Sequence, residues 1–149
     1  MVSELVPAEV LSAEISSEVS ELPPITIGHE SALVERRVRA FYWSVADIFE
    51  TWLNRTKNYH TSRSYRRDVL DFIEFIGIRW PENSWELLKT STEEVQRWRD
   101  YMDGELDLAP KTLNRRISSL SGFFEFLRGS AEKAKLPIML HNPAHKDFI

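Results

Sequence analysis

Apolar residues recur every three or four positions in several stretches of the chain, and no stretch alternates long enough to require a β-strand. The first strong stretch predicts a helix over about residues 44–56, because Ser44 and Asp47 resemble a capping arrangement ahead of an apolar stripe. A weaker stripe within residues 29–43 allows a short helix or a linker. The periodicity as a whole predicts an all-α fold.

The second predicted helix begins at a cap provided by Thr61 or Ser62 and ends near Gly77, which suits the left-handed conformation that follows many helices. Residues 79–83 contain a proline and are predicted to form a loop. The apolar stripe of this helix consists of Tyr65, Val69, Phe72, Ile73 and Ile76.

The third and fourth helices have clear start signals. Ser91 stands three residues before Glu94, the spacing of a capping box, and the helix after it is predicted to turn Leu106 inward. Pro110 suits the first turn of the fourth helix, and Gly129 is predicted to close it. The four helices, with at most one or two short additions, predict a compact bundle of four to five helices.

The net charge of −4 is unevenly distributed along the chain. Residues 1–28 hold five Glu and no Lys or Arg, and they end near two consecutive prolines, which predicts a disordered acidic tail. The rest carries 19 basic and 18 acidic residues. Residues 54–67 contain five basic residues and no acid, and residues 108–124 contain three and no acid, whereas residues 93–107 contain six acids. Local patches of this kind favour a polyanionic partner.

The second and fourth predicted helices carry cations opposite their apolar stripes. Arginine side chains can bind phosphate or guanine, and Asn114 has the amide that reads adenine. A solvated helix face shows the same pattern, and Arg67 could simply pair with Asp71 one turn away, so both readings remain open. The cations opposite the stripes, by helical geometry, are Arg63, Arg67, Lys111 and Arg115.

Two segments of the chain resemble the tyrosine recombinase (phage integrase) family. Residues 61–72, TSRSYRRDVLDF, look like the start of the second helix in the core-binding, SAM-like domain of that family. Residues 109–127, APKTLNRRISSLSGFFEFL, are similar to the last major helix of the domain. Asn142-Pro143 resembles the dipeptide that opens the linker to the catalytic domain. The resemblance covers roughly residues 44–145.

The resemblance implies an orthogonal bundle of two crossed helical hairpins whose second and fourth helices enter the major groove of double-stranded DNA. It makes residues 44–140 the DNA-binding core-binding domain and residues 141–149 the start of a linker to a catalytic domain that is absent here. That catalytic domain and further recombinase protomers on DNA are the other implied partners. Arg116, near the apolar stripe, is expected to pair with an acid instead. The implied DNA contacts are Thr61, Arg63, Ser64, Arg66, Arg67, Lys111, Thr112, Asn114, Arg115 and Ser119.

The chain is not expected to be an enzyme on its own. Catalysis in the family needs a nucleophilic tyrosine with arginine, lysine and histidine residues from the domain after the linker, and none of the four tyrosines here has a matching context. No cofactor or metal is expected, because cysteine is absent and Pro143 separates His141 from His145. The alternatives are a helical protein-interaction module and a stand-alone regulator of recombination.

Three further expectations concern location and side-chain environment. No signal peptide and no apolar run long enough to cross a bilayer is present, which fits a cytoplasmic protein without membrane contact. Arg55 and Lys57 are expected to form a solvated helix end. Phe126 is expected to be covered by residues 136–149 or by the catalytic domain.

Overall fold

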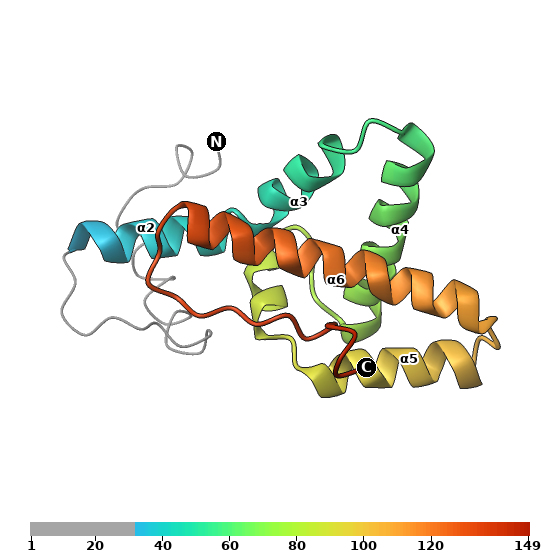
Figure 1. Ribbon diagram of the computed structural model, residues 1–149. Helices are drawn as coiled ribbons and strands as arrows, with labels where there is room; N and C mark the ends of the chain where they lie inside the picture. The colour runs from blue at the N-terminus through green and yellow to red at the C-terminus, as the bar shows by residue number, and fades with distance from the viewer. Residues whose placement is uncertain (1–31) are drawn as a thin grey trace.

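The computed structural model describes residues 32–149, and within that range it contains helices but no strand (Figure 1). The all-α prediction is therefore confirmed, and the predicted acidic tail lies outside the described residues. The elements are α2 (Ala32–Trp43), α3 (Val45–Asn54), α4 (Tyr59–Ile76), the 3₁₀ helix η2 (Ser84–Lys89), α5 (Thr92–Gly104) and α6 (Pro110–Lys133).

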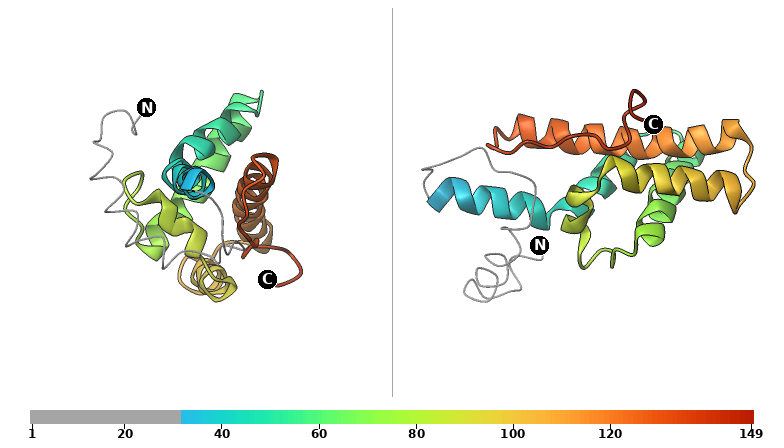
Figure 2. Two further views of the ribbon diagram at one scale, coloured as in Figure 1. Left: turned by 90° about the vertical axis from the view of Figure 1, so that its left-hand side faces the viewer. Right: turned by 90° about the horizontal axis from the view of Figure 1, so that it is seen from below.

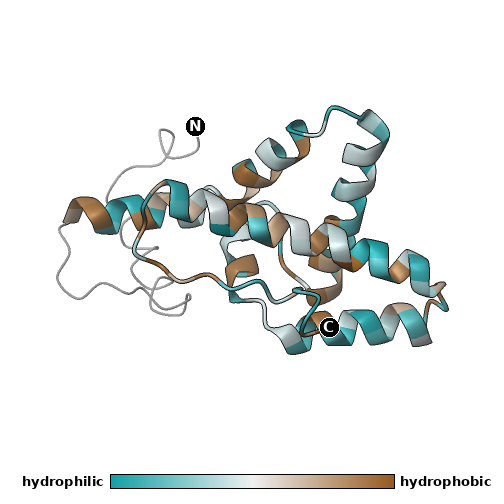
Figure 3. Ribbon diagram, viewed as in Figure 1, coloured by the Kyte–Doolittle hydropathy of each residue, from teal (hydrophilic) through white to brown (hydrophobic). Residues whose placement is uncertain are grey.

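The helices form two hairpins, α3–α4 and α5–α6, that cross one another. α4 crosses α6 steeply, α5 runs beside α6, and α2 extends toward the C-terminal end of α6 (Figures 1 and 2). α4 and α6 make the most extensive contact between any two described elements. Each helix buries one apolar stripe, so its opposite face is left for polar residues. Figure 3 shows hydrophilic residues along α5 and in the N-terminal part of α6.

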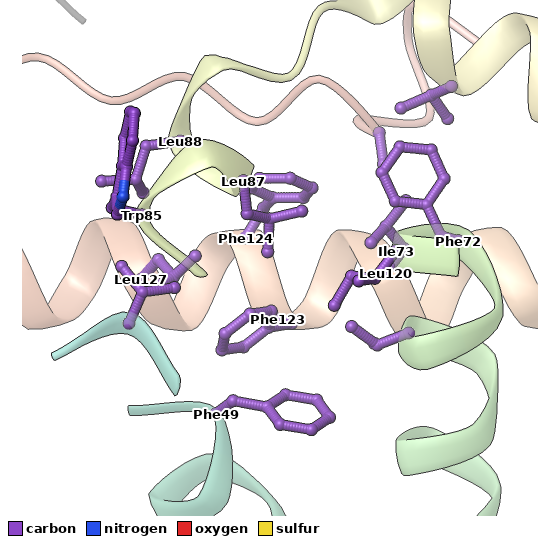
Figure 4. Close-up of a cluster of buried hydrophobic side chains, with 14 of the residues drawn as sticks. Phe49, Phe72, Ile73, Trp85, Leu87, Leu88, Leu120, Phe123, Phe124 and Leu127 are labelled. Atoms are coloured by element: carbon purple, nitrogen blue, oxygen red, sulfur yellow. The ribbon is translucent and has the colours of Figure 1, made fainter. Parts of the chain in front are cut away.

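The core lies where the hairpins meet and is rich in aromatic rings. Phe49 of α3 and Phe123 of α6 are fully buried, with ring centroids 5.1 Å apart in an edge-to-face arrangement (Figure 4). Phe72 of α4 meets Trp98 of α5 in the same way, also at 5.1 Å. The core also extends beyond residues 44–140, since it includes Val38 and Tyr42 of α2 and Ala144 near the C-terminus.

The capping hydrogen bonds of α3 and α4 differ from those predicted, although α3 begins at Val45, directly after Ser44, as expected. The Ser44 hydroxyl donates to the Ala40 carbonyl and makes no capping bond to α3, because α2 runs directly into α3 with a single residue between them. Asn58 caps α4 by accepting the Thr61 N–H at 3.1 Å. Ser62 serves another purpose, since its hydroxyl donates to the Leu53 carbonyl of α3.

Other boundaries are partly as predicted. The capping box at Ser91 and Glu94 is present, and Gly77 ends α4 with a φ of 81°. Gly129 lies inside α6, which continues to Lys133 because Ala131 is still buried in the core. Leu106 is exposed, since α5 ends at Gly104.

The residues after α4 form more structure than the predicted loop. Residues 79–83 are a turn as expected, but η2 follows directly and buries Trp85, Leu87 and Leu88 (Figure 4). Six residues are too few to reveal a helical period in the sequence. Figure 4 shows these side chains beside Phe124 and Leu127 of α6, so η2 closes one side of the core.

A buried carboxylate stabilises the crossing of α4 and α6. Asp68 of α4 is 1% exposed and accepts a hydrogen bond from the Ser119 hydroxyl at 2.8 Å. Arg115 Nη1 donates to the same carboxylate oxygen at 2.5 Å, and Arg116 Nε lies 4.0 Å from the other oxygen. A buried charge is tolerated only when it is paired and hydrogen-bonded, so these contacts constrain how α6 lies on α4.

We expect Asp68→Asn to lower the free energy of unfolding by about 1.5–3 kcal/mol, the usual cost of losing a hydrogen-bonded charge. Chemical denaturation at pH 7 measures it. The matched control is Asp71→Asn, one turn along α4. Burial raises the pKa of Asp71, a shift that Arg116 opposes, so the ionised form of Asp71 is disfavoured by folding. The control should therefore leave stability near that of the wild type or raise it; an equal loss in both variants would contradict the role of Asp68.

Candidate nucleic-acid interface

Arg115 is held by Asp68 while remaining accessible. Its side chain is 49% exposed, and its ion pair with Asp68 involves only one of the two terminal guanidinium nitrogens. Because a guanidinium has five N–H donors, Arg115 keeps donors for a ligand while Asp68 fixes its position. The buried carboxylate thus orients a cation on the surface of α6.

Arg116 has the structural role that its position suggested. Its side chain is 19% exposed, and Nη1 donates to Asp71 at 3.4 Å. The expected pairing of Arg116 with an acid is confirmed. Asp71 therefore makes its ion pair with Arg116 of α6, and not with Arg67 as the helical spacing allowed. Arg67 contributes only a weaker electrostatic effect that lowers the pKa of Asp71.

Arg66 is engaged in a second ion pair, between α4 and α3. Its two terminal nitrogens each donate to a Glu50 oxygen at 2.7 Å, the bidentate geometry that favours strong pairing. This hydrogen bonding holds the pKa of Glu50 below its usual range and raises the pKa of Arg66. Arg66 also lies over the ring of Phe49 at 5.9 Å. Its charge is thus largely offset by a neighbouring carboxylate.

Three of the predicted contact residues are exposed cations without such a partner. Within residues 32–149, no carboxylate oxygen lies within ion-pair distance of Arg63, Arg67 or Lys111. Arg63 and Arg67 are on α4, one turn apart, and Lys111 is in the first turn of α6. Arg63, Arg67 and Lys111 therefore place uncompensated positive charge in the N-terminal halves of the two crossed helices.

The polar residues among the predicted contacts differ in accessibility. Asn114 is exposed, and Thr61, Ser64 and Thr112 are partly exposed. Ser119 is 4% exposed, and its hydroxyl is used by Asp68. Its place on a DNA-facing surface was wrongly predicted, because helical geometry alone does not show that α4 covers this side of α6.

Asp68 itself was missed from the sequence, although a signal was present. It lies between Tyr65 and Phe72 on the side of α4 that faces the core, where a carboxylate requires a cationic partner from another element. Residues 108–124 contain adjacent arginines and no acid, which made them the natural source of that partner.

Arg55 and Phe126 lie against each other between α3 and α6. Arg55 is exposed at the C-terminal end of α3, as expected, and its guanidinium also lies over the Phe126 ring, 5.2 Å from the ring centroid. The ring borders a groove between α3 and α6, which Trp52 and Gly122 also line. Residues 136–149 do not line this groove, and the cover of Phe126 by a catalytic domain stays a prediction.

The described residues hold neither a cluster of metal ligands nor a membrane-spanning helix. No group of three or more His, Asp or Glu side chains in residues 32–149 is arranged to hold a metal ion. No helix in that range is both long enough and apolar enough to span a membrane.

Comparison with known proteins identifies the domain. The family described as "Phage integrase, N-terminal SAM-like domain" matches residues 47–130, from α3 to near the end of α6. No solved structure matches the chain significantly.

Two curated relatives come from Rickettsia. The tyrosine recombinase XerD of Rickettsia conorii is 27% identical over 96 residues, which cover 64% of this chain and 30% of the relative. The tyrosine recombinase XerD of Rickettsia bellii is 31% identical over 64 residues, which cover 43% of this chain and 19% of the relative. The matched region thus spans less than a third of either relative. Since the family match extends over more than half of the sequence and over the crossed hairpins, the chain belongs to the phage integrase family through its N-terminal SAM-like domain.

Proposed function

We propose that this chain binds duplex DNA through the α4/α6 face and positions a tyrosine recombinase on its crossover site, without cutting or joining a strand itself. The α4/α6 face is here defined by Arg63 and Arg67 on α4 and Lys111, Asn114 and Arg115 on α6. The observation that carries the proposal is that Arg63, Arg67 and Lys111 are uncompensated cations on two helices whose crossing Asp68 stabilises.

Each group on this face suits a chemical feature of DNA. Arg63, Arg67 and Lys111 can neutralise backbone phosphates, which supply most of the salt-dependent affinity. Asn114 can donate to and accept from an adenine edge in the major groove. Lys111 also stands in the first turn of α6, where free backbone N–H groups favour a phosphate oxygen. Arg115 adds a guanidinium whose position is set by Asp68.

Not every predicted contact residue has the same role in this proposal. Thr61, Ser64 and Thr112 are close enough in sequence to the cations to donate to the same phosphates. Arg66 contributes less to the net charge, since Glu50 offsets it. Ser119 supports the face from beneath by donating to Asp68.

The remaining functions of a recombinase belong to regions outside the matched domain. This chain covers 30% or less of its XerD relatives, and strand cleavage, the clamp around DNA and contacts between protomers would involve the rest of such a protein. A module acting alone lacks the effective concentration that a linked second domain provides, so we expect its affinity to be modest.

Charge reversal on the α4/α6 face should weaken DNA binding. We expect Arg63→Glu and Lys111→Glu each to reduce duplex affinity at least about tenfold and to lower the slope of log K against log salt by ~1. Fluorescence anisotropy across a salt series measures both. The matched control is Arg79→Glu, an exposed arginine beyond the opposite end of α4, which should keep the wild-type slope.

The outcomes separate the competing functions. Wild-type binding that is lost equally in all three variants would mean that total charge, and not the α4/α6 face, determines affinity. If the wild type does not bind duplex DNA even at low salt, a protein-interaction role for the helical bundle replaces the proposal.

Removing the partner of Arg66 gives a complementary prediction. Glu50→Gln leaves the guanidinium uncompensated beside Arg63 and Arg67, so the salt slope should steepen by up to ~0.9 if Arg66 then reaches a phosphate. The ion pair it removes is solvent-exposed, so we expect a stability loss below about 1 kcal/mol. Anisotropy and denaturation on the same protein measure the two effects; a shallower slope would contradict the proposed position of the duplex.

A further inference from the structure

The C-terminal segment, residues 136–149, doubles back along α6 toward α5 (Figures 1 and 2). Its fixed point is Asn142, which is 7% exposed. The Asn142 amide nitrogen lies 3.0 Å from Ser121 Oγ and 2.9 Å from Glu125 Oε2, and it donates to these α6 groups. The Asn142 side-chain oxygen accepts the Ala144 N–H at 3.0 Å, which folds the segment into a tight turn. Residues 142–144 are therefore buried against α6.

Hydrogen bonds on both sides of Asn142 hold the rest of the segment. Arg128 Nε of α6 donates to the Leu140 carbonyl at 2.9 Å, and the Gln96 amide of α5 donates to the Phe148 carbonyl at 3.0 Å. The segment is thus attached to two helices, so the side chains between these contacts have defined positions.

A hollow of about 520 Å³ lies between α5, α6 and this segment. Arg99 of α5 and Lys146 of the segment line it, and neither has a carboxylate partner within residues 32–149. The one acid in its lining, Glu125, is engaged by Arg128 and Asn142. The other polar side chains in the lining are Asn114, Ser118, Ser121, Arg128 and His145, and the apolar residues Ile117, Ala144 and Ile149 line it as well.

This composition suits an anion. Two uncompensated cations, two serine hydroxyls and the Asn114 amide line a partly enclosed space, where electrostatic attraction is screened less than on an open surface. α5 is acidic overall, and most of its charged side chains are exposed. Arg99 is an exception, because it is half-buried and lines the hollow.

The hollow is continuous with the α4/α6 face. Asn114 belongs to both, and Ser118 follows it one turn later on the same side of α6. A duplex lying on α6 would therefore bring its backbone past the mouth of the hollow.

We propose that this hollow is a second phosphate-binding site for duplex DNA, in which Arg99 and Lys146 contact a backbone phosphate beside the α4/α6 face. The inference rests on the proposed function and extends it, since it makes the C-terminal segment a part of the DNA interface in addition to its expected role as a linker. Asn142 acts as a positioning residue for Lys146.

The test compares two substitutions with two matched controls in the same chain. Arg99→Ala and Lys146→Ala should each reduce duplex affinity by about 3- to 10-fold and lower the salt slope by ~0.9. Arg97→Ala, on the exposed side of α5, and Lys135→Ala, exposed just after α6, remove the same charges elsewhere and should keep the wild-type slope.

Coupling to Asn142 tests the positioning role. In an Asn142→Ala background the segment loses its fixed point, so adding Lys146→Ala should change affinity less than twofold. Amide hydrogen exchange of residues 141–149 should rise in that background while α4 stays protected, which shows that the domain remains folded.

Three results would overturn the inference. The first is Arg99→Ala binding with the same affinity and slope as Arg97→Ala. The second is an undiminished effect of Lys146→Ala in the Asn142→Ala background. The third is Arg99-dependent binding of inorganic phosphate, seen as chemical-shift changes, without any effect of Arg99→Ala on DNA. If any of these results is obtained while Arg63→Glu still weakens binding, the second site is disproved and the proposed function stands. If the wild type does not bind DNA, the proposed function itself is disproved.

Discussion

The arrangement of this domain depends on the carboxylate of Asp68, which is buried between α4 and α6. An ionised group in that position is stable only with partners, and it takes them from α6: a hydroxyl from Ser119 and guanidinium groups from Arg115 and Arg116. The same contacts that hold the two helices together therefore draw positive charge to their crossing. Arg116 is largely buried and stabilises the crossing, whereas Arg115 is half-exposed and also presents its guanidinium at the surface.

The fold explains why a chain with a net negative charge can present a cationic face. Three acidic residues of α3 and α4 are ion-paired: Glu50 with Arg66, Asp68 with Arg115, and Asp71 with Arg116. Most of the acids of α5 lie on its exposed sides, whereas Arg99 is directed toward α6. Three cations left without a carboxylate partner, Arg63, Arg67 and Lys111, lie on the crossed helices α4 and α6, and local charge matters more to a polyanion than the total does.

Much of this architecture could be predicted from the sequence, because it depends on local signals. The apolar stripes of α3 to α6, the capping box at Ser91 and the left-handed Gly77 are all properties of short segments. The resemblance of residues 61–72 and 109–127 to recombinase helices also agreed with the family match. What the sequence could not reveal depends on contacts between distant residues.

Three features of the structure depend on such contacts between distant residues. Thr61 and Ser62 were the predicted caps of α4, but Asn58 caps this helix. The Ser62 hydroxyl instead donates to the Leu53 carbonyl and connects α4 to α3. Ser119 looks like a surface residue until α4 covers it. Residues 136–149 have no helical period, and their position follows from the hydrogen bonds of Asn142 to α6. In each case the side chain had alternative partners, and tertiary packing selected one.

The central claim is that one side of the crossed pair α4 and α6 lies against the DNA backbone. Backbone amide chemical shifts, followed by NMR as a duplex is titrated into the protein at low salt, test this most directly. We predict that the largest changes lie in the N-terminal halves of α4 and α6 and in residues 142–149, with η2 and the exposed side of α5 unaffected. Changes concentrated on η2 or on the acidic side of α5 would contradict it.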